Sequence, residues 1–297
     1  MSTLAPSHTV TTRDPKGLKF LSIVEAAYNK AGLSEDEAQR VNDTAGGADV
    51  VGKFIANNRR ADKYKAEEVP SKYGYISGYV KPKSLSDQLA ILQGHFPDLG
   101  ECDLSLGGQK VEAAEGLFLV PQWQKVAPTY GEAMQKVLDA LSKAYGGRFK
   151  NWIAGKIGPA YLRQSARSVE GWKTLAAEQR DQDILIVHAQ FGFRHRGRSV
   201  RRALEVMLSN EFGLGAFAVG IMLLTHMDRL QNVNDLWIDC AGDEFRSDAD
   251  GVFSGAPVFG FVGDQLGFDT HRVVAAFDYC GSVSAFLPQS KFVPSDS

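Results

Sequence analysis

Apolar residues recur at helical spacing through the first part of the chain. From Lys16 onward, leucine, valine and alanine residues fall on one face of a helix, which Gly32 ends. Ser34 and Glu37 have the spacing of a capping box, which predicts the start of a second helix. Further helices are expected at residues 50–58 and 84–93.

Residues 59–83 lack any such period. They are rich in lysine, tyrosine and glycine and include Pro70 and Pro82. Because proline removes a backbone donor and disfavours helix in the residue before it, we expect an extended connector here. Residues 1–14 are polar and precede the first apolar pattern, so we expect a flexible N-terminus.

The second half combines strand-like and helix-like patterns. Residues 183–190 are rich in isoleucine and valine and predict a strand. From Ser199 to Phe212, apolar residues fall at positions i, i+3, i+4, i+7 and i+8, which predicts an amphipathic helix. The apolar residues 216–224 predict a buried strand, and this strand–helix–strand order would allow a parallel crossover. Further strands are expected at 116–123, 236–240 and 258–262, and further helices at 130–145, 168–179 and 272–279.

These patterns predict an α+β fold, with a mixed α/β core in the C-terminal half and a mainly helical N-terminal part. We expect three regions: a flexible N-terminus (1–14), a mainly helical region with the extended connector (15–110), and a mixed α/β region (115–290). The loop-rich, acidic residues 96–116 suggest where the last two regions meet.

Composition favours a soluble protein without a strong overall charge. The 297 residues carry 33 Lys and Arg against 35 Asp and Glu, so any binding of a polyanion depends on a local patch. The most apolar run, residues 213–224, is shorter than the about 20 residues of a membrane-spanning helix, so we expect no membrane partner. Three scattered cysteines (Cys102, Cys240 and Cys280) and the lack of a signal-peptide pattern predict a cytoplasmic location.

The basic loop, residues 194–202 (RHRGRSVRR), lies between a predicted strand and a predicted helix. Backbone N–H groups at a helix start, together with guanidinium groups, are suited to bind phosphate or carboxylate. The alternative is that these arginines pair with acidic residues of the chain itself. The predicted anion-binding residues are Arg194, His195, Arg196, Arg198, Ser199, Arg201 and Arg202.

The connector interleaves aromatic and basic residues. Such a segment can hold single-stranded nucleic acid, because bases stack on the rings while cations follow the phosphates. The alternative is an extended arm laid across the domain, with its rings half-buried. The residues predicted for stacking and charge are Tyr64, Lys72, Tyr73, Tyr75, Tyr79 and Lys81.

An acidic cluster follows the predicted strand at 236–240. Asp239, Asp243 and Glu244 offer the oxygen ligands that Mg²⁺, Mn²⁺ and Ca²⁺ prefer, so a divalent metal is the cofactor that the sequence allows. Such an ion would activate water for hydrolysis of a phosphate ester while the basic loop held the substrate. The alternative is an acidic turn that faces solvent or pairs with an arginine.

Three functions therefore remain open. The first, which we favour, is a protein that binds a phosphate-bearing polyanion, for example a nucleic acid, through the basic loop. The second is a homo-oligomeric structural protein with charge-complementary faces, and the third is a metal-assisted phosphohydrolase. The sequence does not decide whether the protein is an enzyme.

Overall fold

The computed structural model describes residues 11–44, 46–58, 63–100, 102–107 and 111–288. Residues 1–10 of the expected flexible N-terminus and residues 59–62 of the expected connector lie outside this part. The chain divides into two compact units, Met1–Arg59 and Arg60–Ser297. Among the helices of the described residues, none combines the length and the apolar character needed to cross a membrane.

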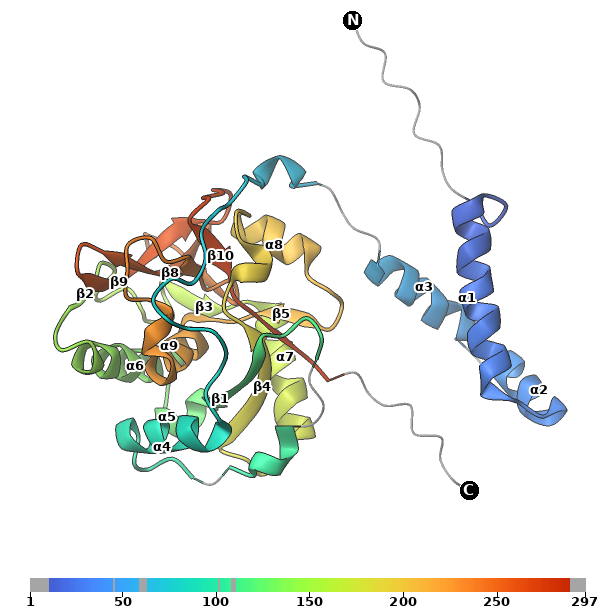
Figure 1. Cartoon of the computed structure of the whole chain (residues 1–297), viewed down its shortest axis with the longest axis horizontal. Coiled ribbons are helices and arrows are strands. Elements are labelled where there is room, and N and C mark those ends of the chain that lie inside the picture. Colours follow the sequence, from blue (N-terminus) through green and yellow to red (C-terminus); the bar gives the residue numbers. More distant parts are fainter. Residues whose placement is uncertain (1–10, 45, 59–62, 101, 108–110, 289–297) are drawn as a thin grey trace, which may run out of the picture. The chain divides into compact units, whose positions relative to one another are not determined.

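The first unit consists of three helices, drawn in blue in Figure 1: α1 (Pro15–Ala31), α2 (Glu35–Asp43) and α3 (Gly47–Asn58). All three were expected from the sequence. Gly32 ends α1 in the left-handed backbone region (φ 63°), which glycine adopts without steric cost. Ser34 and Glu37 form the capping box that starts α2. Neither α1 nor α2 has a buried residue.

The second unit combines helices with two sheets, and the α+β class is confirmed (Figure 1). Its helices are α4 (Leu85–His95), α5 (Trp123–Val126), α6 (Tyr130–Ala144), α7 (Ala166–Glu178), α8 (Val200–Val206) and α9 (Ala216–Thr225). The smaller sheet is antiparallel and contains, in order, β1 (Gly116–Pro121), β4 (Ile184–Gln190), β11 (Ser284–Phe286) and β5 (Glu211–Gly213). The larger sheet contains, in order, β10 (Cys280–Ser282), β6 (Trp237–Asp239), β8 (Gly255–Val262), β7 (Asp243–Phe245) and β3 (Leu162–Gln164). In the same sheet, β9 (Gln265–Arg272) joins β8 to β2 (Phe149–Asn151).

Helix α9 lies in the hydrophobic core, and all ten of its residues are buried. It packs against α4, α6 and β1. Val137 of α6 and Phe259 of β8 both lie beside Gly220, where the helix has no side chain. Because Phe259 belongs to the larger sheet and β1 to the smaller one, α9 contacts both sheets.

The predicted strand at residues 216–224 is wrong, because this segment is α9. An unbroken apolar run has no period by which a buried strand and a buried helix can be distinguished. The predicted parallel crossover disappears with that strand, and β4 pairs antiparallel with both of its neighbours.

Two other predicted helices differ from the structure. Helix α8 ends at Val206 instead of Phe212, because residues 211–213 form β5 and pair with β11. Arg272 is the last residue of β9, and residues 273–279 form turns and irregular structure, in which Phe277 packs against the ring of His271 and Tyr279 against that of Trp237. The remaining predicted elements of the second unit agree with the structure to within a few residues.

Residues 63–83 of the expected connector are mostly irregular and extended, with one turn of 3-10 helix, η1 (Lys65–Glu67). It lies along the second unit and is bonded to it through its backbone. The N–H of Val69 donates to the carbonyl of Gly197 at 2.7 Å, and that of Tyr79 donates to the carbonyl of Asp228 at 3.2 Å. The connector is thus an arm laid across the second unit, as in the second of the two alternatives above.

A substitution at Gly220 would test the packing of α9 against α6. A β-carbon at this position would lie 2.5 Å from Cγ1 of Val137, so one of the two helices must shift. We expect Gly220→Ala to lower the free energy of unfolding by about 1–3 kcal/mol, measured by denaturant titration of the full chain. The control is Gly94→Ala in α4, where the added methyl meets nothing within 4 Å and should be neutral or stabilising by up to about 1 kcal/mol. Equal effects of the two changes would contradict this account of the packing.

Candidate functional site

The basic loop joins β4 to α8 through a turn of 3-10 helix, η3 (Phe193–His195). It is held against β10, because the N–H of Gly197 donates to the carbonyl of Cys280 at 2.9 Å. Gly192 and Gly281 lie back to back beside this bond. A β-carbon on Gly192 would lie 2.7 Å from the carbonyl oxygen of Gly281, so neither glycine has room for a side chain.

Two arginines of the basic loop are paired within the chain. Arg201 donates from Nε to the carboxylate of Glu67 at 2.7 Å, and this contact lowers the pKa of Glu67. Arg202 bonds Glu68 at 2.5 Å and Glu205 at 2.7 Å and is almost fully buried. Helix α8 has only seven residues. The positive charges of its first turn are therefore neutralised by carboxylates of the connector and by Glu205 in its own last turn.

Ser199 and His195 also have partners inside the fold. The Ser199 hydroxyl accepts from the N–H of Arg202 at 3.1 Å and donates to Glu67 at 2.6 Å. The ring of His195 is buried, with Nε2 at 2.6 Å from Glu211, and burial lowers the pKa of His195. Burial opposes the charge of Glu211, but hydrogen bonds from His195, the Ser284 hydroxyl and a backbone N–H lower the pKa of Glu211 to about 2. These two predicted anion-binding residues therefore serve the structure.

The remaining arginines, Arg194, Arg196 and Arg198, line one open hollow of about 560 Å³. Arg194 lies 3.4 Å from Glu211, and Arg198 lies 3.3 Å from Glu68. Arg196 stacks on the ring of Phe193 at 4.0 Å and donates to a backbone carbonyl of the connector at 3.1 Å. Among the described residues, no carboxylate forms an ion pair with Arg196. The rest of the lining consists of Ala113, Ala114, Glu115, Gln190 and Phe193.

Two tyrosines of the connector point into the second unit. Tyr75 and Tyr79 both donate their hydroxyls to Glu115, at 2.6 and 3.2 Å. The buried guanidinium of Arg229 lies 3.9 Å from the ring centre of Tyr75. Tyr79 is only 3% exposed, so its ring is covered by protein and does not face a ligand.

The other predicted residues of the connector lie nearer the surface. Tyr64 is half-buried under the guanidinium of Arg201, and Tyr73 packs edge-on against Tyr279. Lys72 and Lys81 are exposed, and neither lines the hollow. The segment therefore contributes packing and carboxylates, and it does not present a continuous row of rings.

The three predicted metal-binding carboxylates have different partners. Asp243 is buried at the start of α9, where it accepts from the N–H of Ala216 at 2.7 Å and from the hydroxyl of Tyr130 at 2.7 and 2.9 Å. Glu244 pairs with Arg163 at 2.6 Å on the surface. Asp239 instead faces His271. The structure does not bring these carboxylates to one point.

Tyr130 also forms part of an apolar pocket of about 290 Å³, with Trp123, Trp172 and Phe217 among its other walls. Its hydroxyl is bound to Asp243, whose carboxyl lies buried behind the pocket. Burial raises the pKa of Asp243 to about 7, so this group titrates near neutral pH. No local pattern in the sequence marks the pocket, because its walls come from five separate segments.

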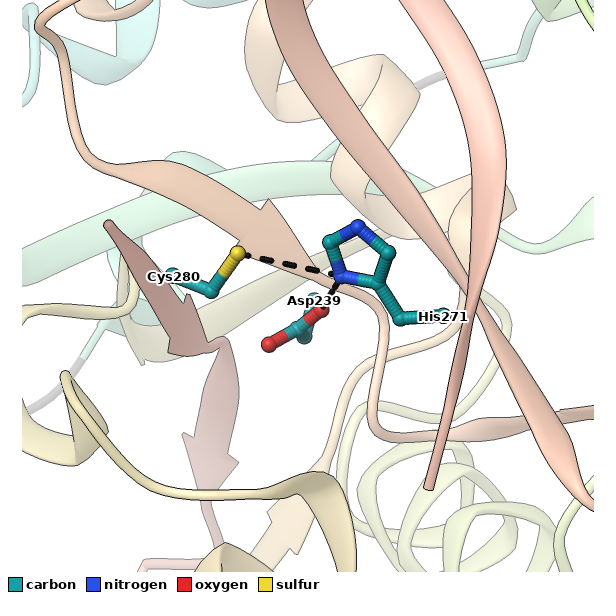
Figure 2. Close-up of side chains that lie close together, drawn as sticks. All are labelled: Asp239, His271 and Cys280. Atoms are coloured by element: carbon teal, nitrogen blue, oxygen red, sulfur yellow. Dashed lines mark hydrogen bonds and ion pairs between the residues drawn. The ribbon is translucent and has the colours of Figure 1, made fainter. Parts of the chain in front are cut away.

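Asp239 belongs to a cluster that the sequence did not reveal (Figure 2). The side chains of Asp239, His271 and Cys280 come from β6, β9 and β10, and their ligand atoms lie within 4.8 Å of one another. Nδ1 of His271 is 3.2 Å from Oδ1 of Asp239 and 3.7 Å from Sγ of Cys280. Burial, and then the nearby carboxylates of Asp239 and Asp278, raise the pKa of the Cys280 thiol well above its ordinary value.

This cluster is the only group of three or more His, Cys, Asp or Glu side chains with metal-ligand spacing among the described residues. His271 and Cys280 follow Asp239 at wide and irregular separations, so no motif marks them. Only the fold of the larger sheet brings them together.

Comparison with known proteins adds no assignment. No protein-family model, curated protein or solved structure matches this chain.

The raised pKa of Asp243 predicts that the stability of the fold depends on pH. In the unfolded chain it ionises near its ordinary pKa of about 4, whereas in the folded chain it keeps its proton to about pH 7. Its contribution to the free energy of unfolding therefore falls between about pH 4 and 7, by up to about 1.4 kcal/mol per pH unit, and is constant above that range.

We expect Asp243→Asn to lack this dependence, because its amide oxygen accepts the same bonds but does not titrate. Denaturant titrations at several pH values would show the stability of the wild type falling relative to Asp243→Asn as the pH rises. The control is Asp248→Asn at an exposed loop position, for which the difference from the wild type should stay constant. A constant difference for Asp243→Asn as well would refute the raised pKa.

Proposed function

We propose that this protein binds a phosphate-bearing polyanion, with nucleic acid as the favoured class, at the hollow of Arg194, Arg196 and Arg198. The observation that carries the proposal is that three guanidinium groups, one of them without a described carboxylate partner, line the same open hollow. Guanidinium forks bind phosphate oxygens two at a time, and an open hollow gives a chain of phosphates access.

The charge around the hollow supports a net attraction for anions. Glu211 is shared between Arg194 and His195, and Glu68 is shared between Arg198 and Arg202. Glu68 therefore compensates Arg198 only in part. Glu211 compensates Arg194 more fully, because burial lowers the pKa of His195 and leaves that ring uncharged at neutral pH. Arg196 is the cation of the hollow without such a partner among the described residues. Glu115 also lines the hollow, but burial raises its pKa and its oxygens accept the two tyrosine hydroxyls, which weakens its repulsion of an anion.

The same pairing limits the strength of the interaction. Arg201 and Arg202 are paired with carboxylates, and Arg194 and Arg198 each keep one carboxylate contact, so the site offers at most three cations to phosphate instead of five. For a single strand, three phosphate contacts give a slope of about −2 in log K against log salt concentration. The proposed site is thus a moderate, salt-sensitive one and not a polybasic surface.

Fluorescence anisotropy with a labelled single-stranded oligonucleotide tests this proposal. We expect the affinity of the wild type to fall about 10- to 20-fold between about 50 and about 200 mM salt. The triple variant Arg194→Gln, Arg196→Gln, Arg198→Gln should lose most of the binding at the lower salt and most of the salt dependence. Circular dichroism and thermal melting of the variant would test whether it is folded.

The matched control is the double variant Lys72→Gln, Lys81→Gln, which removes exposed cations from the connector but leaves the hollow intact. Its affinity should be unchanged. Undiminished binding by the folded arginine variant would refute the proposal, and a loss confined to the lysine variant would move the interface to the connector.

Self-association is the second candidate function, and the first unit supports it. Arg201 and Arg202 of the basic loop pair with carboxylates of their own chain, which reduces the charge-complementary faces expected from the sequence. Apolar side chains of α1 and α3 are exposed instead: Leu18 is 55% exposed, Ile23 58%, Val50 68% and Phe54 56%. Apolar side chains exposed in this number are typical of an interface, and a second copy of this chain is the occupant we propose.

Light scattering of the full chain tests this candidate. We expect a dimer or larger assembly that dissociates in the double variant Leu18→Gln, Ile23→Gln, because polar side chains lose the hydrophobic gain of association. Val252→Gln, at a valine that is 82% exposed in the second unit, should leave the assembly unchanged. A monomeric wild type at high concentration would end this candidate.

We further propose a cytoplasmic location. Cys102, Cys240 and Cys280 are all free thiols, which supports a reducing compartment.

A further inference from the structure

We propose that Asp239, His271 and Cys280 form a binding site for a transition-metal ion of the zinc class, with a fourth position open to water or to a ligand atom. This site is separate from the arginine hollow. It differs from the acidic cluster expected from the sequence, because it shares only Asp239 with that set.

Two of the three separations in the cluster match those of a tetrahedral metal site, and all three ligand atoms lie within 4.8 Å of one another. Zinc binds carboxylate oxygen and imidazole nitrogen at about 2.1 Å and thiolate sulfur at about 2.3 Å. Tetrahedral angles then separate a nitrogen from an oxygen ligand by about 3.4 Å, and a nitrogen from a sulfur ligand by about 3.6 Å. The corresponding separations here are 3.2 Å and 3.7 Å, so an ion can enter with little movement of the side chains.

The direction of the contacts distinguishes a metal site from a catalytic relay. In a nucleophile–histidine–carboxylate relay, the nucleophile and the carboxylate bind opposite nitrogens of the imidazole. Here the Cys280 thiol and the Asp239 carboxylate both approach Nδ1 of His271 (Figure 2). Three ligand atoms that converge on one point are expected around a single cation. Cys280 is also completely buried, which does not suit a nucleophile.

The strand register explains why the three side chains meet. His271 pairs with Ala256 of β8, and Asp239 pairs with Val258, two residues further along the same strand. Paired and i+2 residues share a face of a sheet, so Asp239 and His271 project to the same side. The small side chain of Ala256 leaves space between them. Cys280 joins this face from β10, where it pairs with Trp237, two residues before Asp239.

Neighbouring rings hold the imidazole in place. His271 stacks nearly parallel to Trp237, with 6.2 Å between the ring centres and 10° between the ring planes, and it also contacts Phe277, with 4.6 Å between the ring centres. Its side chain is 15% exposed, whereas that of Asp239 is 4% exposed. The imidazole is therefore fixed in orientation and lies at the solvent side of the cluster, where an ion or a small ligand can enter.

The donor set favours zinc over magnesium or calcium. Thiolate and imidazole ligands suit borderline and soft cations, whereas Mg²⁺ and Ca²⁺ require shells of oxygen atoms. No fourth His, Cys, Asp or Glu side chain joins the cluster among the described residues. Three protein ligands with one open position is the arrangement of zinc sites that bind water or substrate, while closed structural sites use four.

Cobalt substitution tests this proposal directly. The full chain is treated with a chelator, dialysed and titrated with Co²⁺, which has a thiolate charge-transfer band and intense visible bands when it is tetrahedral. We expect one Co²⁺ per chain with both features, and its displacement by one equivalent of Zn²⁺. Elemental analysis of the zinc-loaded protein after gel filtration should give one zinc per chain.

Two cysteine variants provide the matched pair. Cys280→Ser should lose the thiolate charge-transfer band and weaken zinc binding more than about 100-fold, since even outer partners of a metal ligand contribute 10- to 100-fold. Cys240→Ser replaces an equally buried thiol next to Asp239 that is not part of the cluster, and it should keep the band and the affinity. Asp239→Asn should keep the band but bind zinc more weakly.

Three results would overturn the proposal: no Co²⁺ spectrum, a spectrum that lacks the thiolate band, or a spectrum that persists in Cys280→Ser. If Cys280→Ser were unfolded by circular dichroism, His271→Asn would replace it, with the same expected loss of zinc binding. Because the readouts are metal content and spectra, they do not depend on the anion-binding function.

Discussion

Helix α9 is buried on every side, and much of the second unit is arranged to satisfy that constraint. A helix without an exposed face needs apolar neighbours all round, and α4, α6, β1 and Phe259 of the larger sheet supply them. Its first N–H groups have no access to water, so Asp243 accepts the one from Ala216. That carboxyl is then itself buried, and the hydroxyl of Tyr130 satisfies its second oxygen. The burial of α9 thus requires Asp243 of β7 as a cap, and the burial of Asp243 requires the hydroxyl of Tyr130 in α6.

The connector supplies negative charge to the basic loop. Five arginines within nine residues repel one another. Most of their counter-charge comes from Glu67 and Glu68, which lie 130 to 134 residues away in sequence, and from Glu205 on α8 itself. Glu67 and Glu68 neutralise Arg201 and Arg202. The backbone of the connector also forms hydrogen bonds with the backbone of the basic loop. The arm therefore decides which arginines serve the structure and which remain open to a ligand. This division is why the candidate anion site is smaller than the basic loop from which it was inferred.

The sequence predicted most elements, because amphipathic periods, capping residues and prolines act locally. The capping box at Ser34, the strand at residues 184–190 and the extended connector are of this kind. It failed where tertiary contacts decide the outcome. The apolar run of α9 has no period, and the helix expected from Ser199 to Phe212 stops early because residues 211–213 form β5 and pair with β11. The basic loop was found from its composition alone, but His271 and Cys280 meet Asp239 only through strand pairing, which no local pattern records.

The contact between Gly192 and Gly281 joins the two candidate sites, because Gly192 precedes the basic loop and Gly281 follows Cys280. The two backbones touch where neither residue has a side chain, and Gly192 also has a positive φ of 109°. Even alanine would separate the loop from β10. In a survey of tolerated substitutions, these two positions would therefore look as intolerant as catalytic residues, although they bind nothing. Intolerance to substitution at Gly192 and Gly281 would reflect the steric contact between the two backbones and not a catalytic or binding role.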